Sequence, residues 1–137
     1  MTIENFDHFT IRAADFDASK RFYEEALGLR YQERPGFAVA AALLFVGNEP
    51  LVNLFQASPE QEAAFAQQKD DGQWRTGRFH HVAFWATGLP QFRERLAQKG
   101  VAGRERTLTD KHQIIVKDPD GVEIEINFSL AEAGAAG

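Results

Sequence analysis

The sequence has no cysteine among its 137 residues. Without cysteine no disulfide framework can form, and no thiol can act as a nucleophile or as a metal ligand. Basic residues are also in short supply, because 15 Lys and Arg against 20 Asp and Glu leave a formal net charge of -5. Proteins that bind nucleic acid need a basic surface, so this balance argues against a nucleic-acid partner.

Long apolar runs are absent as well. The longest, Phe37 to Val46, has ten residues, about half of the ~20 that a membrane-spanning helix needs. The first five residues contain neither the basic region nor the apolar core of a signal peptide. We therefore expect a cytoplasmic protein that has no membrane partner.

Hydrophobic residues make up 44% of the chain. At about 150 residues per domain, the length predicts one structural domain. A chain of this size buries roughly two-thirds of the surface that it exposes when unfolded, which is enough for a core without disulfides.

The pattern strand–helix–strand–strand–strand occurs twice. In the first half the helix extends from Ala18 to Leu27 and stops at Gly28, and in the second from Pro90 to Lys99 and stops at Gly100. Glycine adopts the left-handed conformation at a helix C-terminus without a Cβ clash. We expect strands at 6–12, 29–32, 37–46 and 51–56 in the first half, and at 79–86, 101–106, 113–117 and 122–128 in the second.

The two halves can be superimposed along the sequence. His8 then aligns with His81 and Asn53 with Glu125, at offsets of 73 and 72 residues. A repeat of this length indicates two similar modules that pack or pair about a pseudo-twofold axis. We assign residues 1–57 to the first βαβββ module, 58–78 to a linker with a short helix, and 79–137 to the second module and a tail that we expect to be frayed.

Two segments carry a resemblance to a known family. Asp15 to Leu29 resembles the first-module signature of the vicinal oxygen chelate superfamily, and Asp118 to Ile126 resembles its terminal hairpin. That superfamily contains glyoxalase I, the extradiol dioxygenases, the fosfomycin-resistance proteins and the bleomycin-binding proteins. The resemblance covers nearly the whole chain. It implies an α+β fold of paired βαβββ modules that form an open cup of mixed sheet, with a divalent metal ion at the bottom.

The resemblance also implies a ligand set. Superfamily ligands come from the first and last strands of each module, and these positions hold His8, Asn53, His81 and Glu125. Two imidazoles and one carboxylate suit Fe²⁺ and leave coordination positions open for substrate, with Mn²⁺, Zn²⁺ and Ni²⁺ as alternatives. Asn53 departs from the carboxylate or glutamine of glyoxalase-type enzymes. Asn53 could bind the metal weakly through its carbonyl oxygen, donate a hydrogen bond to a group that binds the metal, or do neither.

The remaining histidines are candidates for acid–base work. His80 is adjacent to His81, so on a strand the two side chains point to opposite faces, and we expect His80 to face outward. His112 lies three residues before Ile115 and therefore faces away from the cup if Ile115 faces into it. We nevertheless expect His112 to act with Glu125 as a catalytic acid or base, since only His80 or His112 can fill that role.

Other side chains are expected to line the cup. Alternation places Thr10 and Arg12 on the same face as His8, and an inward arginine can hold a carboxylate or a phosphate. Aromatic residues at such spacing are also common in cores. The residues that we expect to contact substrate are Thr10, Arg12, Asn53, Phe55, Trp85, Gln113 and Ile115.

Four reactions or roles fit the family, and the residues rank them. The ligand set favours oxygen-dependent cleavage of a small diol-type substrate, although Ile115 stands where extradiol enzymes usually have a tyrosine. A glyoxalase-like lyase or isomerase is disfavoured, because Asn53 cannot act as a base. A fosfomycin-type thiol transferase is disfavoured, because Leu130 to Gly137 contains no arginine. A bleomycin-type binding protein would not need the three ligands together.

A second copy of the chain is the other expected partner. Superfamily members commonly bury the edges of their sheets in dimers, and a bare edge is a site for unwanted pairing. We therefore expect a homodimer that binds a small-molecule substrate.

Overall fold

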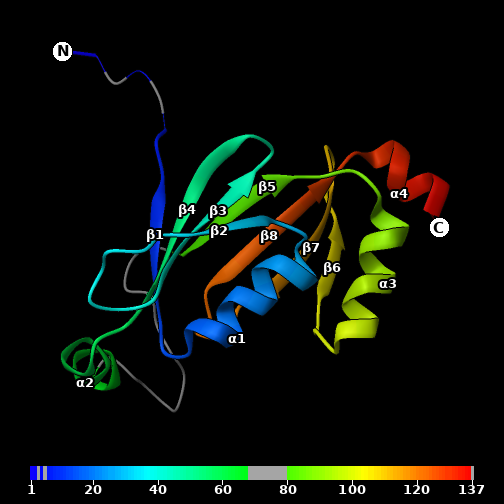
Figure 1. The fold of residues 1–137 in the computed structure, drawn as a ribbon. Helices are drawn as coiled ribbons and strands as arrows, with labels where there is room; N and C mark the ends of the chain where they lie inside the picture. The colour runs from blue at the N-terminus through cyan, green and yellow to red at the C-terminus, as the bar shows by residue number, and fades with distance from the viewer. Residues whose placement is uncertain (3, 5, 68–79, 137) are drawn as a thin grey trace. The chain divides into compact units, whose positions relative to one another are not determined.

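The computed structural model describes residues 1, 2, 4, 6–67 and 80–136 of the chain (Figure 1). The chain divides into two compact units, Met1–Gln67 and Gln68–Gly137.

The first unit contains a four-stranded mixed sheet. Strand β1 pairs in parallel with β4, and β4–β3 and β3–β2 are antiparallel, which gives the order β1-β4-β3-β2. The elements are β1 (Phe9–Ala13), α1 (Phe16–Arg21), the π-helical turn η1 (Phe22–Ala26), β2 (Arg30–Glu33), β3 (Ala41–Val46), β4 (Glu49–Gln56) and α2 (Pro59–Gln67).

The second unit repeats this topology. Its sheet has the order β5-β8-β7-β6, with β5 and β8 parallel and the other pairs antiparallel. The elements are β5 (His81–Trp85), α3 (Leu89–Lys99), β6 (Arg104–Thr107), β7 (His112–Lys117), β8 (Glu123–Phe128) and α4 (Leu130–Ala136).

The register of the parallel pairs confirms the internal repeat. Thr10 lies beside Asn53 in the first unit, and Ala83 lies beside Glu125 in the second. These are the positions that the sequence alignment superimposes. The predicted α+β fold of two βαβββ modules is therefore confirmed.

The first helix begins at Phe16, two residues before the predicted start at Ala18. The Asp15 carboxylate accepts a hydrogen bond of 3.1 Å from the Ala18 N–H, which satisfies one of the donors that every helix leaves unpaired at its start. Helix α1 then widens into η1, and Gly28 with φ 75° ends it. The buried face carries Phe22 and Tyr23.

Each sheet buries one face under apolar side chains. In the first unit Ile11 and Leu54, neighbours in the β1–β4 register, are both buried. In the second unit the Phe92 ring of α3 packs on the Phe128 ring of β8, with centroids 5.9 Å apart. Burying a side chain of this size contributes about 1.5–3 kcal/mol. The polar candidate residues, such as Asn53 and Glu125, lie on the opposite face of each sheet.

Some boundaries differ from those predicted. Strand β3 begins at Ala41 rather than Phe37, because the Pro35–Gly36 turn continues into a loop whose Phe37 ring packs edge-on against Phe55 instead of joining the ladder. Strand β4 begins at Glu49, because the turn before it is shorter than predicted and Val46 already pairs with Glu49. The start of the strand expected at 79–86 lies outside the described residues.

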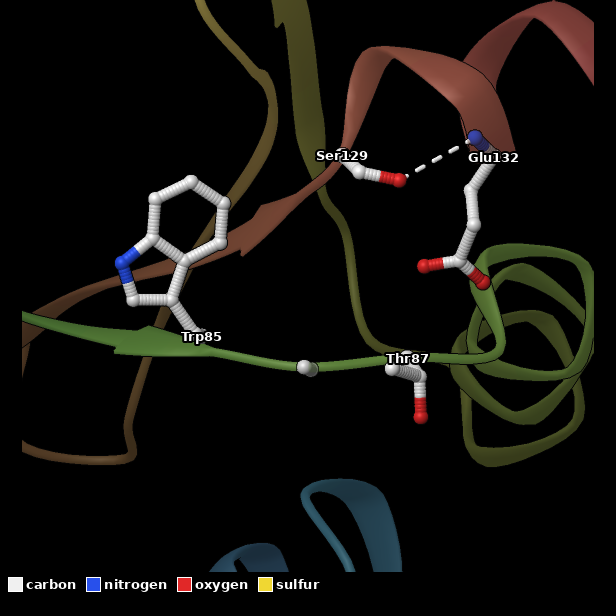
Figure 2. A pocket seen from close by; sticks show the side chains of 5 residues that line it. Trp85, Thr87, Ser129 and Glu132 are labelled. Atoms are coloured by element: carbon white, nitrogen blue, oxygen red, sulfur yellow. Dashed lines mark hydrogen bonds between the residues drawn. The ribbon is translucent and has the colours of Figure 1, made fainter.

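The C-terminal tail is a helix, so the expectation of a frayed end is wrong. The Ser129 hydroxyl accepts a hydrogen bond of 3.3 Å from the Glu132 N–H at the start of α4. The Glu132 carboxylate in turn accepts hydrogen bonds of 2.6 and 3.4 Å from the N–H groups of Gly88 and Leu89, where α3 begins (Figure 2). Helix α3 has no side-chain cap of its own at Gly88, so α4 supplies its anionic cap.

A polar network ties α3 to the edge of its sheet. Arg93 donates two hydrogen bonds of 2.8 Å to the Glu105 carboxylate. The His112 ring lies between Glu105 and Thr107, with its nitrogens 3.0 Å and 2.8 Å from their oxygen atoms. The Arg93 guanidinium, with a smaller contribution from His112, lowers the pKa of Glu105 below its ordinary value against the effect of partial burial.

Within the described residues, no helix has both the length and the apolar character needed to cross a membrane.

Replacing Glu132 tests the cap that α4 provides to α3. We expect Glu132→Ala to lower the free energy of unfolding by about 1 kcal/mol, because two N–H groups at a helix start lose their anionic acceptor. Urea unfolding followed by circular dichroism measures this change. Glu94→Ala is the matched control on the exposed side of α3, where we expect less than about 0.5 kcal/mol. Equal losses in both variants would contradict the cap.

Replacing Glu105 tests the network through the pH dependence of stability. The pKa of Glu105 is lowered in the folded state, so its stabilising contribution is present above the unfolded pKa of about 4.3 and is lost as the pH falls through the folded value. We expect Glu105→Gln to be less stable than wild type at pH 7 and to lose less stability on acidification. Thermal melts from pH 7 to pH 3 measure this, and an unchanged acid slope would contradict it.

Candidate metal centre

Three potential metal ligands share one face of the second sheet. His81 pairs with Glu123 in the β5–β8 register, and Glu125 lies two residues further along β8. Side chains two residues apart on a strand point to the same face, as do neighbours in a parallel register. The parallel pairing therefore places His81 between two carboxylates.

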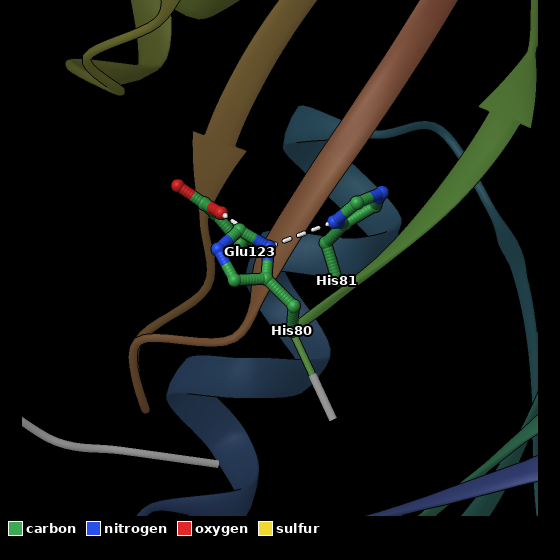
Figure 3. Close-up of side chains that lie close together, drawn as sticks. All are labelled: His80, His81 and Glu123. Atoms are coloured by element: carbon green, nitrogen blue, oxygen red, sulfur yellow. Dashed lines mark hydrogen bonds and ion pairs between the residues drawn. The ribbon is translucent and has the colours of Figure 1, made fainter. Parts of the chain in front are cut away.

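The distances connect these side chains into a row. His81 Nε2 lies 3.5 Å from Glu125 Oε1, and His81 Nδ1 lies 2.8 Å from His80 Nδ1. His80 Nδ1 is also 3.5 Å from Glu123 Oε2 (Figure 3). The row runs from Glu125 through both imidazoles to Glu123.

The position of His80 corrects part of the prediction. Its side chain is exposed, as expected, but its ring turns toward His81 and Glu123 instead of pointing to the opposite face. Strand β5 begins at His81. His80 therefore lies outside the ladder, where the alternation of a strand does not constrain its side chain.

The row offers two alternative sets of metal ligands. One set uses His81 Nε2 and Glu125. The other uses His80, His81 and Glu123, whose ligand atoms lie within 4.8 Å of one another. Two ligands that each lie about 2.0–2.2 Å from an ion are about 3.0–3.6 Å apart, so the 3.5 Å between His81 Nε2 and Glu125 Oε1 fits the first set. In the second set the 3.5 Å between His80 Nδ1 and Glu123 Oε2 fits as well, but the two imidazole Nδ1 atoms are only 2.8 Å apart. Imidazole and carboxylate donors suit Fe²⁺ and neighbouring divalent ions.

Glu125 is held more firmly than Glu123. Gln113 donates a hydrogen bond of 2.8 Å to Glu125 Oε2, and Arg106 Nη2 lies 3.5 Å from Oε1. The Glu125 side chain is only 13% exposed. Glu123 has a weaker contact, 3.9 Å from Arg104. One oxygen of Glu125 is therefore fixed while the other faces His81, which is how neighbouring hydrogen bonds orient a metal ligand.

In the first unit, His8 directly precedes β1. Its Nδ1 contacts the Asp7 carboxylate. A carboxylate on one ring nitrogen sets the tautomer and leaves Nε2 as the available ligand atom. The role of His8 as a metal ligand stays a prediction, and Asp7 is a partner of its ring that the sequence analysis missed.

Asn53 has a different environment. Its side chain is buried, and its Oδ1 accepts a hydrogen bond of 3.2 Å from Arg34 Nη1. The amide oxygen that would bind a metal is therefore already engaged by a cation. This geometry favours a role beside the substrate over direct coordination.

The residues predicted to contact substrate lie on one face of each sheet, which we call the functional face: the face that carries Asn53 in the first sheet and Glu125 in the second. Thr10, Arg12 and Phe55 share a face with Asn53, and Gln113 and Ile115 share one with Glu125. Their roles differ, however. Gln113 is almost fully buried and bonds both Glu125 and Asn127 at 2.8 Å, so it positions the carboxylate.

Trp85 is placed at an open pocket. Its indole is 65% exposed, and Ala86, Thr87, Ser129 and Glu132 form the remaining lining (Figure 2).

His112 lies on the opposite face of the sheet from Glu125. It pairs with Phe128 across β7 and β8, and both of its ring nitrogens are engaged by Thr107 and Glu105. Its catalytic role stays a prediction, and this geometry favours a structural one. His80 is the histidine that lies beside the candidate ligands.

Arg106 and Arg34 are functional candidates that the sequence analysis missed. They occupy equivalent positions in the two modules, 72 residues apart. Each contacts the residue that the repeat places at the ligand position of the last strand, Glu125 or Asn53. The repeat contained the signal, because the overlay of Asn53 on Glu125 also superimposes the two arginines.

Comparison with solved structures gives the same fold. An integron cassette protein from the mobile metagenome of V. cholerae is 25% identical with a TM-score of 0.64, over 93% of this chain and 97% of that chain. The fosfomycin resistance protein FosX from Listeria monocytogenes is 17% identical with a TM-score of 0.67, over 96% and 98%. TnmS3, an antibiotic binding protein from a Streptomyces species, is 19% identical with a TM-score of 0.66, over 94% and 98%.

No curated protein matches the chain. A family model does, and it spans residues 5–126, which include both modules and the candidate ligands. The chain belongs to the Glyoxalase/Bleomycin resistance protein/Dioxygenase superfamily.

Proposed function

We propose that this chain is a divalent-metal-dependent enzyme that cleaves a small diol-type substrate with molecular oxygen. The observation that carries the proposal is the pair formed by His81 and Glu125, whose Nε2 and Oε1 atoms lie 3.5 Å apart. The second oxygen of Glu125 is fixed by Gln113 at 2.8 Å. His8, the third ligand that the family resemblance implies, stays a prediction from the sequence.

The donor set determines which metal fits. Two neutral imidazoles and one carboxylate suit Fe²⁺, while Mn²⁺, Zn²⁺ and Ni²⁺ remain alternatives. When bound, such an ion supplies Lewis-acid stabilisation of the negative charge that develops on the oxygens of a chelating substrate. The superfamily match supports metal dependence in general, and the choice of Fe²⁺ rests on the ligand types alone.

The chain's own residues orient these ligands. Gln113 donates to Glu125, which keeps one carboxylate oxygen turned toward His81. Asp7 accepts from His8 Nδ1 and leaves Nε2 for the metal. Arg106 Nη2 lies 3.5 Å from Glu125 Oε1 and gives this carboxylate a positively charged neighbour.

Proton transfer is assigned to His80. A diol substrate must lose a hydroxyl proton when it chelates, and a nearby imidazole is the usual acceptor. His80 is exposed and lies 2.8 Å from His81. Glu123, 3.5 Å from His80, is then the group that orients this ring.

The alternatives within the family have weaker support. A glyoxalase-like lyase or isomerase needs a base at the fourth position, where Asn53 instead accepts a hydrogen bond from Arg34. A fosfomycin-type thiol transferase stays an alternative on fold alone, given the 17% identity to FosX.

A non-catalytic binding protein is the second candidate. The exposed indole of Trp85 at an open pocket favours it, since such a surface can stack on a flat ligand. TnmS3, of the same fold, is an antibiotic binding protein. Metal binding by His81 and Glu125 separates the two functions.

The homodimer and the cytoplasmic location also stay predictions. Among the described strands, β1 pairs only with β4, and β5 only with β8, so each unit has an edge strand that carries apolar and aromatic residues. An edge of this kind is a surface that a partner can cover.

Metal loading tests the ligand set. After anaerobic incubation with Fe²⁺ and dialysis, we expect about one ion per wild-type chain and almost none in His81→Ala. Because His81 belongs to both alternative sets, the decisive variants are those of the carboxylates. We expect Glu125→Gln to lose the ion and Glu123→Gln to retain it, because only Glu125 is held in place by a buried hydrogen-bond donor. Elemental analysis measures the ratio.

The opposite pattern would assign the ion to His80, His81 and Glu123 instead. An ion-free wild-type protein would end the metalloenzyme proposal and leave the binding protein in its place.

Oxygen uptake with a panel of catechols tests the reaction. We expect Glu125→Gln to abolish uptake while circular dichroism stays unchanged, because Gln113 can still donate to the amide oxygen. We expect His80→Gln to retain the ion and to lower kcat by roughly 10²-fold, the usual contribution of a general acid or base. The acid limb of the pH–rate profile should disappear in the same variant. Uptake by Glu125→Gln at the wild-type rate would rule out the assignment.

A further inference from the structure

A row of side chains crosses the functional face of the first sheet. Arg12 of β1 lies beside Phe55 of β4, and Phe55 lies beside Ala41 of β3. The Arg34 N–H, just beyond β2, donates to the Ala41 carbonyl and extends the row by one position. Two arginines therefore stand at the ends of a row whose interior is one aromatic ring and one methyl group.

We propose that Arg12 and Arg34 form a binding site for an oxyanion, a carboxylate or phosphoryl group carried on an apolar body. The site needs no metal ion. The oxyanion site rests on the proposed function in one respect only, namely that the bound oxyanion belongs to the enzyme's substrate.

Both guanidinium groups turn inward along the row. The Arg12 guanidinium carbon lies 4.6 Å from the centroid of the Phe55 ring, and that of Arg34 lies 5.9 Å from the same centroid. Arg34 also lies 4.8 Å from the centroid of Phe37, whose ring meets Phe55 edge-on at 5.1 Å. The small side chain of Ala41 leaves the room that Arg34 needs to reach Phe55.

The part of the chain that the structure describes gives neither guanidinium an anionic partner. No carboxylate in it lies within ion-pair distance of Arg12 or Arg34. The only described polar side chain bonded to Arg34 is the neutral amide of Asn53, at 3.2 Å. Within the described residues, two cations on one face are thus left without a counter-charge.

The second module supplies the comparison. Arg106 occupies the position equivalent to Arg34, and it lies 3.5 Å from the Glu125 carboxylate. Asn53 replaces that carboxylate in the first module, so the same arginine position keeps a hydrogen-bond acceptor but loses its counter-charge. Trp85 stands where the first module has Arg12. The paired, uncompensated charge is specific to the first module.

The geometry defines the ligand. A guanidinium that stacks on a ring by its face keeps its N–H edges available, and those edges match the oxygens of a carboxylate or phosphoryl group. Stacking and the Asn53 hydrogen bond reduce the side-chain freedom that binding would otherwise cost. The exposed Phe37 ring and the half-buried Phe55 ring provide an apolar surface beside the charges. A small aromatic or aliphatic acid fits both features.

Titration of the metal-free full-length protein with matched ligands tests the site. Benzoate and phenylphosphonate carry the two candidate oxyanions, and benzamide is the neutral counterpart of benzoate. In the presence of EDTA, we expect calorimetry to show binding of at least one oxyanion, with benzamide at least ten-fold weaker, because hydrogen bonds to charged groups are about twice as strong as neutral ones. The tighter of the two oxyanions identifies the group.

Variants then locate the binding. We expect Arg12→Gln and Arg34→Gln each to weaken oxyanion binding by about ten-fold or more, and Arg34→Lys, which keeps the charge but not the planar fork, to weaken it less. Arg30→Gln is the matched control, since Arg30 stacks on Phe45 at 4.0 Å on the same sheet but outside the row. Its affinity should stay within two-fold of wild type.

Equal binding of benzamide and benzoate would overturn the proposal, as would an equal loss in Arg30→Gln or an unchanged affinity in Arg34→Gln. Glu125→Gln separates this site from the proposed metal centre. Oxyanion binding that persists in Glu125→Gln supports the site whatever the outcome of metal loading. A protein that loads metal but binds neither oxyanion would refute this site and leave the metal centre intact.

Discussion

The parallel pairing of the first and last strand in each module is the constraint on which the rest of the structure depends. Parallel strands need a long crossover, and here the intervening helix and two strands provide it. The pairing brings Thr10 beside Asn53 and Ala83 beside Glu125, residues more than forty positions apart in the chain. Each functional side chain therefore depends on the complete module, because no local segment contains both members of a pair.

The second consequence of this pairing is a competition for the His81 ring. One nitrogen faces Glu125 and the other faces His80, so the two potential ligand sets share a single imidazole. Burial and hydrogen bonding distinguish them. Gln113 is buried and fixes Glu125, whereas the contacts of Glu123 are longer, 3.5 Å from the exposed His80 and 3.9 Å from Arg104. A ligand whose position is fixed in advance loses less entropy when it binds an ion, which favours the set that contains Glu125.

The sequence predicted the repeat, the order of most elements and the end of the first helix at Gly28, because these depend on periodicity and on local turn chemistry. It did not predict α4. Ser58 and Gln61 form a reciprocal capping box at α2. Ser129 and Glu132 have the same spacing at α4, but there only the Glu132 N–H bonds Ser129, and the Glu132 carboxylate bonds α3 instead. The small residues that follow Glu132 concealed α4. The environment of His80 could not be predicted either, because it depends on β5 beginning at His81. The start of a strand is decided by pairing across the sheet rather than by the strand's own sequence.

The two modules share one sheet topology and differ in the charge of equivalent side chains. Arg106, within β6, contacts Glu125 in the second module. Arg34, just after β2, contacts Asn53 at the equivalent position in the first. Glu125 gives Arg106 a counter-charge, whereas Asn53 gives Arg34 a neutral acceptor. A guanidinium beside a neutral acceptor keeps its attraction for an anion. Under the two proposals above, the carboxylate therefore serves a metal centre in the second module, and the amide at the equivalent position serves an anion site in the first.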